Sequence, residues 1–171
     1  MSELPLVAVT GATGFVGREV VKQARAAGFP VRTVVREPHA ADGVERFHGN
    51  VIYRPSLEGG FDNVKCVIHL VGIINEHQEN TFERAHTEAT RNVIDAAKKA
   101  GVKRYLHMSA LGTRANARSR YHQTKWAAEE VARKSGLAWT IFRPSLIYGP
   151  GDISINVLSK IVRRAPFVPV L

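Results

Sequence analysis

A glycine-rich segment near the amino terminus most constrains what this chain can fold into. In "VAVTGATGFVGREVV", Gly11, Gly14 and Gly17 stand between an apolar, β-branched run and a segment with helical periodicity. Gly11 allows a tight turn, Gly14 lets the backbone approach a ligand closely, and Gly17 lets the helix pack against the strand. The helix N-terminus presents unpaired N–H groups and the positive end of its dipole, which suit a diphosphate. The segment therefore predicts a strand–turn–helix unit that binds phosphate groups.

The rest of the chain continues to alternate between strand-like and helix-like segments. Strands are expected at residues 6–10, 31–35, 66–72, 104–110 and 139–144, with a weaker strand at either 44–47 or 51–53. Helices are expected at residues 15–28, 82–100, 119–135 and 153–164. Because the strands are apolar on both faces, they indicate a parallel sheet covered by helices on both sides. The predicted fold class is α/β, a doubly wound parallel sheet (Rossmann fold) in three αβα layers.

Composition narrows the class of protein. A chain of 171 residues fits one domain with a substantial core, and 44% apolar and 23% charged residues are typical of a soluble globular protein. No apolar run reaches the roughly 18 residues that a membrane-spanning helix needs. The single Cys66 excludes an internal disulfide and a Cys-rich metal site, and the first residues lack a secretory pattern. We expect a cytoplasmic protein and leave peripheral association with a membrane open.

The net charge of 24 − 15 = +9 is compatible with nucleic acid, an anionic membrane surface or a phosphate-bearing ligand. The basic residues are scattered and are not interleaved with aromatic residues that could stack on bases, which argues against nucleic acid. The charge by itself does not separate these partners from ordinary solvated surface. His69, His77, His107 and His122 have no metal-ligand spacing with carboxylates or cysteine, so we predict no metal site.

The end of the second strand bears on the cofactor. A dinucleotide-binding turn is normally followed there by an acidic residue that binds the ribose 2′-OH. Here "TVVREP" places Arg36 at this position, and a guanidinium suits a 2′-phosphate. NADP(H) is therefore preferred, and NAD(H) stays open because Glu37 is adjacent. Arg32, within the same strand, is expected to be surface charge.

Five motifs occur in a familiar order: "TGATGFVG", "HLVG", "HMSALG", "YHQTK" and "RPSLIYGPGD". With them the chain resembles the short-chain dehydrogenase/reductase superfamily, in its extended and atypical branches. It is most similar there to the NADPH-binding accessory subunit of respiratory complex I and its bacterial relatives. The resemblance implies an NAD(P)-binding domain at residues 1–152. Residues 153–171 would begin a small C-terminal substrate region that is only a stub, and "APFVPVL" looks like the start of a strand whose partners are missing.

The resemblance also implies a catalytic set, which is Ser109, Tyr121 and Lys125. Tyr121 would be the general acid or base, and a nearby ammonium would lower its pKa. Lys125 lies four residues further along the expected helix, on the same face, and would also bind the nicotinamide ribose. Ser109 would donate a hydrogen bond to the substrate carbonyl. From the residues alone, Tyr121 covering apolar surface and Lys125 as solvated charge stay open.

The cofactor-binding residues expected from the turn and the resemblance are Gly11, Thr13, Gly14, Phe15, Val16, Gly17, Arg36, Val71, Gly72, Lys125, Pro144 and Ser145. One position departs from the family pattern. Extended members often carry a proton-relaying Asn where this chain has His86, and Asn92 matches a different, packing position. Imidazole can shuttle protons, but it can also be a structural partner, so the relay stays open.

Two functions compete. The Ser–Tyr–Lys set favours an oxidoreductase or epimerase-like enzyme that acts on a carbonyl or alcohol of unidentified small-molecule substrates. The complex I resemblance favours a redox-inactive NADPH-binding module of a membrane-associated complex, with a protein partner or a second copy. An RNA- or NADP-sensing regulator is a third, weaker hypothesis.

Overall fold

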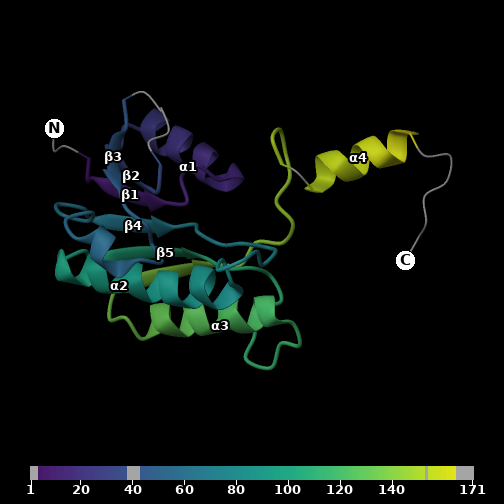
Figure 1. The fold of residues 1–171 in the computed structure, drawn as a ribbon. Helices are drawn as coiled ribbons and strands as arrows, with labels where there is room; N and C mark the ends of the chain where they lie inside the picture. Colours follow the sequence, from purple (N-terminus) through teal and green to yellow (C-terminus); the bar gives the residue numbers. More distant parts are fainter. Residues whose placement is uncertain (1–3, 38–42, 153, 165–171) are drawn as a thin grey trace.

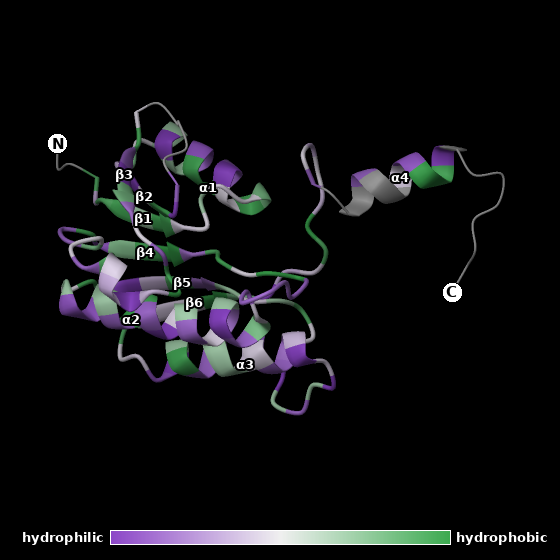
Figure 2. Ribbon diagram, in the orientation of Figure 1, coloured by the Kyte–Doolittle hydropathy of each residue, from purple (hydrophilic) through white to green (hydrophobic). Residues whose placement is uncertain are grey.

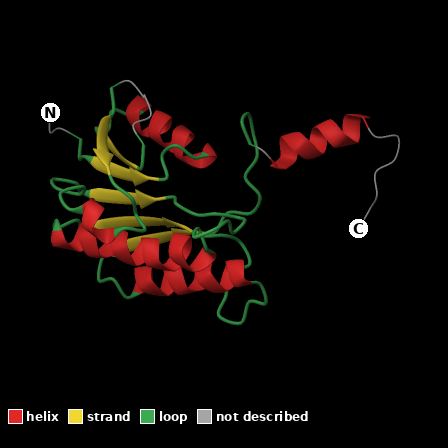
Figure 3. Ribbon diagram, viewed as in Figure 1, coloured by secondary structure: helices red, strands yellow, loops and turns green. Residues whose placement is uncertain are grey.

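The computed structural model describes residues 4–37, 43–152 and 154–164. Within these residues the chain forms one parallel sheet, shown in Figures 1 and 3. In spatial order the strands are β3 (Glu45–His48), β2 (Val31–Val35), β1 (Val7–Thr10), β4 (Cys66–His69), β5 (Arg104–Met108) and β6 (Ala138–Phe142). The order 3-2-1-4-5-6 is that of the Rossmann fold, so the predicted fold class is confirmed.

Helices cover the two faces of the sheet. Helix α1 (Phe15–Ala26) lies against β1 and β2 on one face, while α2 (Ala89–Lys99) and α3 (Arg120–Arg133) pack side by side on the other (Figure 1). A π-helical segment, η2 (Glu83–Glu88), leads directly into α2. The helix expected at residues 82–100 is therefore confirmed, and its first part is π-helical. A short 3-10 helix, η1 (Arg54–Leu57), follows β3.

Helix α4 (Ser154–Arg164) stands away from the sheet in Figure 1. It agrees with the last helix expected from the sequence, apart from Ile153, which is not among the described residues. The "APFVPVL" segment, expected to begin a strand, also lies outside the described residues.

The core consists of two apolar clusters, one on each face. Because side chains alternate along a strand, Val7 and Val9 of β1 face α1, whereas Ala8 faces α2. Val9 of β1 and Val67 of β4 are fully buried, and each contributes about 1.5–3 kcal/mol to the free energy of unfolding relative to an exposed side chain. Figure 2 shows the apolar central strands and the two-coloured surfaces of α2 and α3.

At the β2–β3 edge the structure decides between the two candidate segments for the weaker strand and corrects the expected exposure of Arg32. The weaker strand is β3, while residues 51–53 form the turn that leads into η1. Arg32 was wrongly expected on the surface, since it is buried. Its guanidinium donates to Glu45 Oε1 at 2.8 Å and to the backbone oxygens of Asp62 and Gly60 at 2.8 and 3.2 Å. These acceptors replace water and tie β2 to β3 and to the loop after η1.

Three polar rings stack inside the core beneath α2 and α3. His69 of β4 lies 5.7 Å from His107 of β5 and 6.2 Å from Tyr105, centroid to centroid. The Nδ1 atom of His69 bonds the Thr10 hydroxyl at 2.7 Å, but neither ring nitrogen of His107 has a partner among the described residues. Burial lowers the pKa of His69 well below its usual value and that of His107 to about 3. Both rings are therefore neutral at pH 7.

These histidines make the fold sensitive to acid. An unfolded histidine binds a proton below about pH 6.5, whereas folded His107 does so only near 3, so stability is lost as the pH falls between these values. At pH 5 the His107 ring lowers the free energy of unfolding by about 2 kcal/mol. We expect His107→Phe to lose correspondingly less stability than the wild type between pH 7 and pH 5, as measured by urea unfolding at both pH values.

His48→Gln, a change at an exposed position of β3, is the matched control and should leave the pH dependence of the wild type unchanged. If His107→Phe and the wild type lost equal stability between the two pH values, a protonation-resistant His107 would be excluded.

Candidate functional site

The turn after β1 has the geometry that the glycines predict. Gly11 has φ +74°, and a Cβ there would lie 3.0 Å from the carbonyl carbon of Leu70 and from the Val71 nitrogen. A Cβ at Gly17 would lie 2.1 Å from the Gly11 oxygen. Gly14 is the N-cap of α1. The backbone alone fills this space, so β1, α1 and the segment that leaves β4 meet without intervening side chains.

A cleft of about 220 Å³ opens at the carboxyl ends of β1, β2 and β4. It lies where the strand order reverses, the usual ligand position in a doubly wound sheet. The lining residues are Gly11–Gly14, Val34–Arg36, Gly49–Ile52, Leu70–Ile73, Asn80 and Ala85. Of the residues predicted from the sequence, the cleft brings together Gly11, Thr13, Gly14, Arg36, Val71 and Gly72.

Sequence reasoning missed one wall of this cleft, residues 49–52. Asn92 of α2 donates its side-chain amide to the backbone oxygens of Val51 and Ile52 at 2.9 and 3.1 Å, and Asn50 Oδ1 accepts from the Ile52 N–H at 3.1 Å. The only signal for the wall was the "HGN" that ends β3. Because the position of that strand was ambiguous, the signal could not be used.

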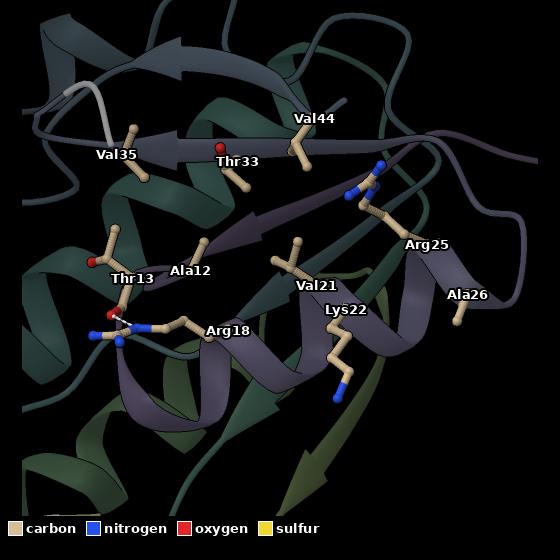
Figure 4. Close-up of a pocket in the computed structure, with 10 residues that line it drawn as sticks. All are labelled: Ala12, Thr13, Arg18, Val21, Lys22, Arg25, Ala26, Thr33, Val35 and Val44. Atoms are coloured by element: carbon tan, nitrogen blue, oxygen red, sulfur yellow. Dashed lines mark hydrogen bonds between the residues drawn. The ribbon is translucent and has the colours of Figure 1, made fainter. Parts of the chain in front are cut away.

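A larger hollow of about 850 Å³ lies beside the cleft, between α1 and β2 (Figure 4). Ala12, Thr13 and Val35 line both spaces. Arg18 donates through Nε to the Thr13 oxygen at 2.8 Å, which places its guanidinium beside the turn. We place the candidate site in the smaller cleft, because the glycine turn lines it and so does Gly72, whose missing side chain leaves room for Lys125.

Lys125 connects the cleft to the end of β5. Its side chain is almost completely buried, and Nζ donates to the Met108 oxygen at 3.1 Å. A Cβ at Gly72 would lie 2.8 Å from the same Nζ, so the glycine leaves the room that the ammonium occupies. Burial lowers the pKa of Lys125 to about 8, although the Glu129 carboxylate opposes the shift.

Tyr121 lies one helical turn before Lys125, in the first turn of α3. Its half-buried ring makes edge contacts with Phe82 and His86, at centroid distances of 5.7 and 5.3 Å. Burial raises the pKa of Tyr121. The sequence-based expectation was the opposite, because it counted the nearby ammonium and not the desolvation of the ring.

Ser109 follows β5 directly and is held on two sides. Its N–H donates to the Phe142 oxygen of β6 at 2.7 Å. Its buried hydroxyl donates to the Thr113 hydroxyl at 3.4 Å. Ser109 is the neighbour in sequence of Met108, whose backbone oxygen accepts the hydrogen bond from Lys125.

His86 is buried and its ring nitrogens are engaged. Nδ1 lies 2.9 Å from the Thr124 hydroxyl of α3, and Nε2 lies 3.2 and 3.1 Å from the backbone N and O of Ile73. Burial, with the nearby Lys125 charge, lowers the pKa of His86 to about 3. A neutral imidazole with these contacts fastens η2 to α3 and to the segment after β4, which favours the structural alternative over a proton relay.

The other predicted residues lie outside the lining of the cleft. Phe15, Val16 and Gly17 form the first turn of α1, while Pro144 and Ser145 follow β6. The Pro144 oxygen accepts from the Leu111 N–H at 2.8 Å. The segment after β6 returns toward α1, since a Cβ at Gly149 would lie 3.8 Å from the Phe15 ring.

Comparisons with known proteins agree with this architecture. The chain belongs to the NAD(P)H-binding family, whose sequence profile matches residues 11–161. It is thus a short-chain dehydrogenase/reductase-like Rossmann domain with a nicotinamide dinucleotide as its cofactor.

Two curated relatives and one solved structure illustrate the range. Ceramide reductase of Caulobacter vibrioides is 33% identical, over 97% of this chain and 54% of that protein. NADH dehydrogenase [ubiquinone] 1 alpha subcomplex subunit 9 of Arabidopsis thaliana is 29% identical, over 95% and 43%. A short-chain dehydrogenase/reductase superfamily protein of Agrobacterium tumefaciens with bound NAD superposes with a TM-score of 0.70 at 26% identity, over 81% of this chain and 48% of that one.

The chain spans about half the length of these curated relatives. Across residues 4–37, 43–152 and 154–164, none of the helices has the length and apolar character required to span a membrane. Over the same residues, no group of three or more His, Cys, Asp or Glu side chains is arranged to hold a metal ion.

The turn geometry gives a direct prediction for Gly17. Because a Cβ there would meet the Gly11 oxygen at 2.1 Å, Gly17→Ala should cost about 3 kcal/mol of unfolding free energy or more and disrupt dinucleotide binding. Urea unfolding and NADPH titration would measure both effects.

Ala26→Gly, at an exposed position of the same helix, is the control and should cost only about 1 kcal/mol while binding is kept. Wild-type stability in Gly17→Ala would contradict the close packing at this turn.

Proposed function

We propose that this domain forms the cofactor-binding half of an NADP(H)-dependent carbonyl reductase with Ser109, Tyr121 and Lys125 as its catalytic residues. The observation that supports this most is the position of the Lys125 ammonium. It lies against Gly72, which lines the cleft, and bonds the Met108 oxygen beside Ser109, one turn from Tyr121.

The glycine turn fits a dinucleotide, since Gly11 and Gly14 line the cleft without side chains at the N-terminus of α1. When bound, NADPH supplies a hydride to the substrate carbonyl. The Tyr121 hydroxyl donates the proton to the carbonyl oxygen as it becomes an alcohol. The Lys125 ammonium stabilises the resulting phenolate, and the Ser109 hydroxyl donates a hydrogen bond that orients the carbonyl.

The substrate we propose is an apolar ketone. Ile74, Leu111, Leu146 and Tyr148 follow β4, β5 and β6 at the carboxyl edge of the sheet, and all four are more than 60% exposed. An apolar substrate would cover such side chains favourably. Similarity to a protein named ceramide reductase points in the same direction.

A second candidate function is a redox-inactive NADPH-binding module of a respiratory complex. It is favoured by the similarity to the complex I alpha subcomplex subunit, at 29% identity over 95% of this chain. The two functions share the cofactor cleft and differ in whether Tyr121 transfers a proton.

Replacing the Tyr121 hydroxyl separates the two functions. Tyr121→Phe should lower kcat for NADPH-dependent reduction of a long-chain ketone by about 100-fold or more, because the proton donor is removed while the ring contacts stay. The dissociation constant for NADPH, measured by fluorescence titration, should not change.

Tyr53→Phe makes the same chemical change on an exposed side chain and should leave both quantities unchanged. Unchanged turnover in Tyr121→Phe would exclude Tyr121 as the donor. Tight NADPH binding by a wild-type protein that reduces no apolar ketone would favour the binding module.

The NADP(H) preference depends on Arg36, which is exposed and lines the cleft. If its guanidinium binds the 2′-phosphate, Arg36→Gln should weaken NADPH binding about 10- to 100-fold, because a charge-assisted hydrogen bond is lost. NADH binding should hardly change, and titration calorimetry with both cofactors would measure the difference.

Lys103→Gln removes the same charge at an exposed position just before β5 and controls for the overall charge of the protein. A wild-type protein that binds NADH more tightly than NADPH would contradict the preference.

A further inference from the structure

A fully buried carboxylate lies directly below the proposed catalytic residues. Glu129 follows Lys125 by one turn of α3, as Lys125 follows Tyr121, so the three lie along one side of the helix. The Glu129 side chain is 0% exposed. Neither the glycine turn nor the proposed proton transfer accounts for a buried acid at this position.

Three hydrogen bonds from two arginines hold the carboxylate. Arg143, just after β6, donates to Oε1 at 2.8 Å and to Oε2 at 2.6 Å, and Arg133 of α3 donates to Oε2 at 2.5 Å. These charge-assisted bonds use three of the roughly four lone-pair positions of a carboxylate and fix the group in one orientation.

The bonds also keep Glu129 ionised. Burial alone would raise its pKa, but the hydrogen bonds from the guanidinium groups, that of Arg143 foremost, outweigh burial and lower it. Glu129 is therefore an anion at neutral pH, and its charge opposes the effect of burial on Lys125.

Other titratable groups also face Lys125. His69 of β4, His86 of η2 and His107 of β5 have lowered pKa values and carry no charge at neutral pH. Tyr121, on the same helix, has a raised pKa and is neutral as well. Among the described side chains whose charge shifts the pKa of Lys125, Glu129 thus supplies the negative charge.

We propose that Glu129 is a positioning residue of the Ser109–Tyr121–Lys125 site. Held in place by Arg133 and Arg143, it supplies the counter-charge for the Lys125 ammonium one helical turn away. It touches neither substrate nor cofactor and acts through Lys125. Arg143, next to Pro144, links the carboxylate to the segment that follows β6. The catalytic consequence rests on the proposed reductase function, whereas the electrostatic one does not.

Two substitutions of opposite charge test the proposal. Glu129→Gln removes the anion, so the pKa of Lys125 should fall by about two units, from the Coulomb energy of a charge one helical turn (about 5.4 Å) away at an effective dielectric constant near 20. Arg143→Gln removes a cation and keeps the anion, so the pKa of Lys125 should rise. Carbon-13 NMR of the lysine ε-carbons would follow the titration, with the Lys125 signal assigned by its loss in Lys125→Arg.

The same variants are then compared in the reductase assay. Activity that needs the Lys125 ammonium is lost as the pH rises through the pKa of Lys125. The alkaline limb of the pH–kcat profile should therefore move to lower pH in Glu129→Gln and to higher pH in Arg143→Gln. Glu130→Gln, which changes the neighbouring carboxylate paired with Arg133 and Lys134, is the matched control and should move neither quantity.

Shifts of the Lys125 titration in opposite directions support the proposal, and a merely structural role would not produce them. An unchanged Lys125 titration in both folded variants overturns it, even if the wild type is an active reductase. Opposite shifts in a protein without turnover would retain the counter-charge and reject the proposed function. If Glu129→Gln does not fold, Glu129→Asp, which keeps the negative charge, is compared with Arg143→Gln instead. A Lys125 pKa that is raised only in Arg143→Gln supports the proposal, and equal Lys125 pKa values in the two variants overturn it.

Discussion

The close approach between the turn after β1 and the backbone leaving β4 is the contact on which the rest of the site depends. Thr10 accepts from the Leu70 N–H at 3.1 Å, and the next residue, Gly11, has no side chain to separate the two segments. This contact sets Val71 and Gly72 alongside the turn. The glycine at 72 then leaves the space into which α3 extends Lys125. A single backbone contact thus aligns the phosphate-binding turn with the proposed catalytic helix.

The other face of the site is built from buried polar groups, which differ in how many hydrogen-bond partners they have. Glu129 accepts hydrogen bonds from Arg133 and Arg143 and keeps its charge, since a buried ion requires such partners. The rings of His69 and His107 have few partners and stay neutral instead. Lys125 lies between these extremes, with one backbone acceptor and a lowered pKa. The charge at this position therefore depends on its neighbours.

Much of the fold could be predicted from the sequence, because its signals are local. The glycine spacing, the alternation of apolar strands with helices and the Tyr-x-x-x-Lys spacing each act within a few residues. Features decided by distant partners could not be read in this way. Arg32 is buried because Glu45, Gly60 and Asp62 converge on it. Glu129 looks like surface charge in "AAEEV" until β6 brings Arg143 to it.

The same distinction applies to the candidate site. The cleft contains half of the residues expected to bind the cofactor, all of them from the turn and the ends of β2 and β4. The wall at residues 49–52 depends on Asn92, some forty residues away, and the local "HGN" pattern could not place it by itself. The roles of Ser109, Tyr121 and Lys125 stay predictions that await the substitutions described above.

The protonation states around α3 favour one direction of the proposed reaction. An ordinary phenol is protonated at neutral pH, and burial, which raises the pKa of Tyr121, keeps its hydroxyl in this form, which is the one that can donate a proton to a carbonyl oxygen. Oxidation of an alcohol would instead require the phenolate, whose formation the buried ring opposes. The Lys125 ammonium, supported by Glu129, becomes most valuable after the proton has left, when it faces a new negative charge. The arrangement therefore fits reduction by NADPH better than oxidation by NADP+.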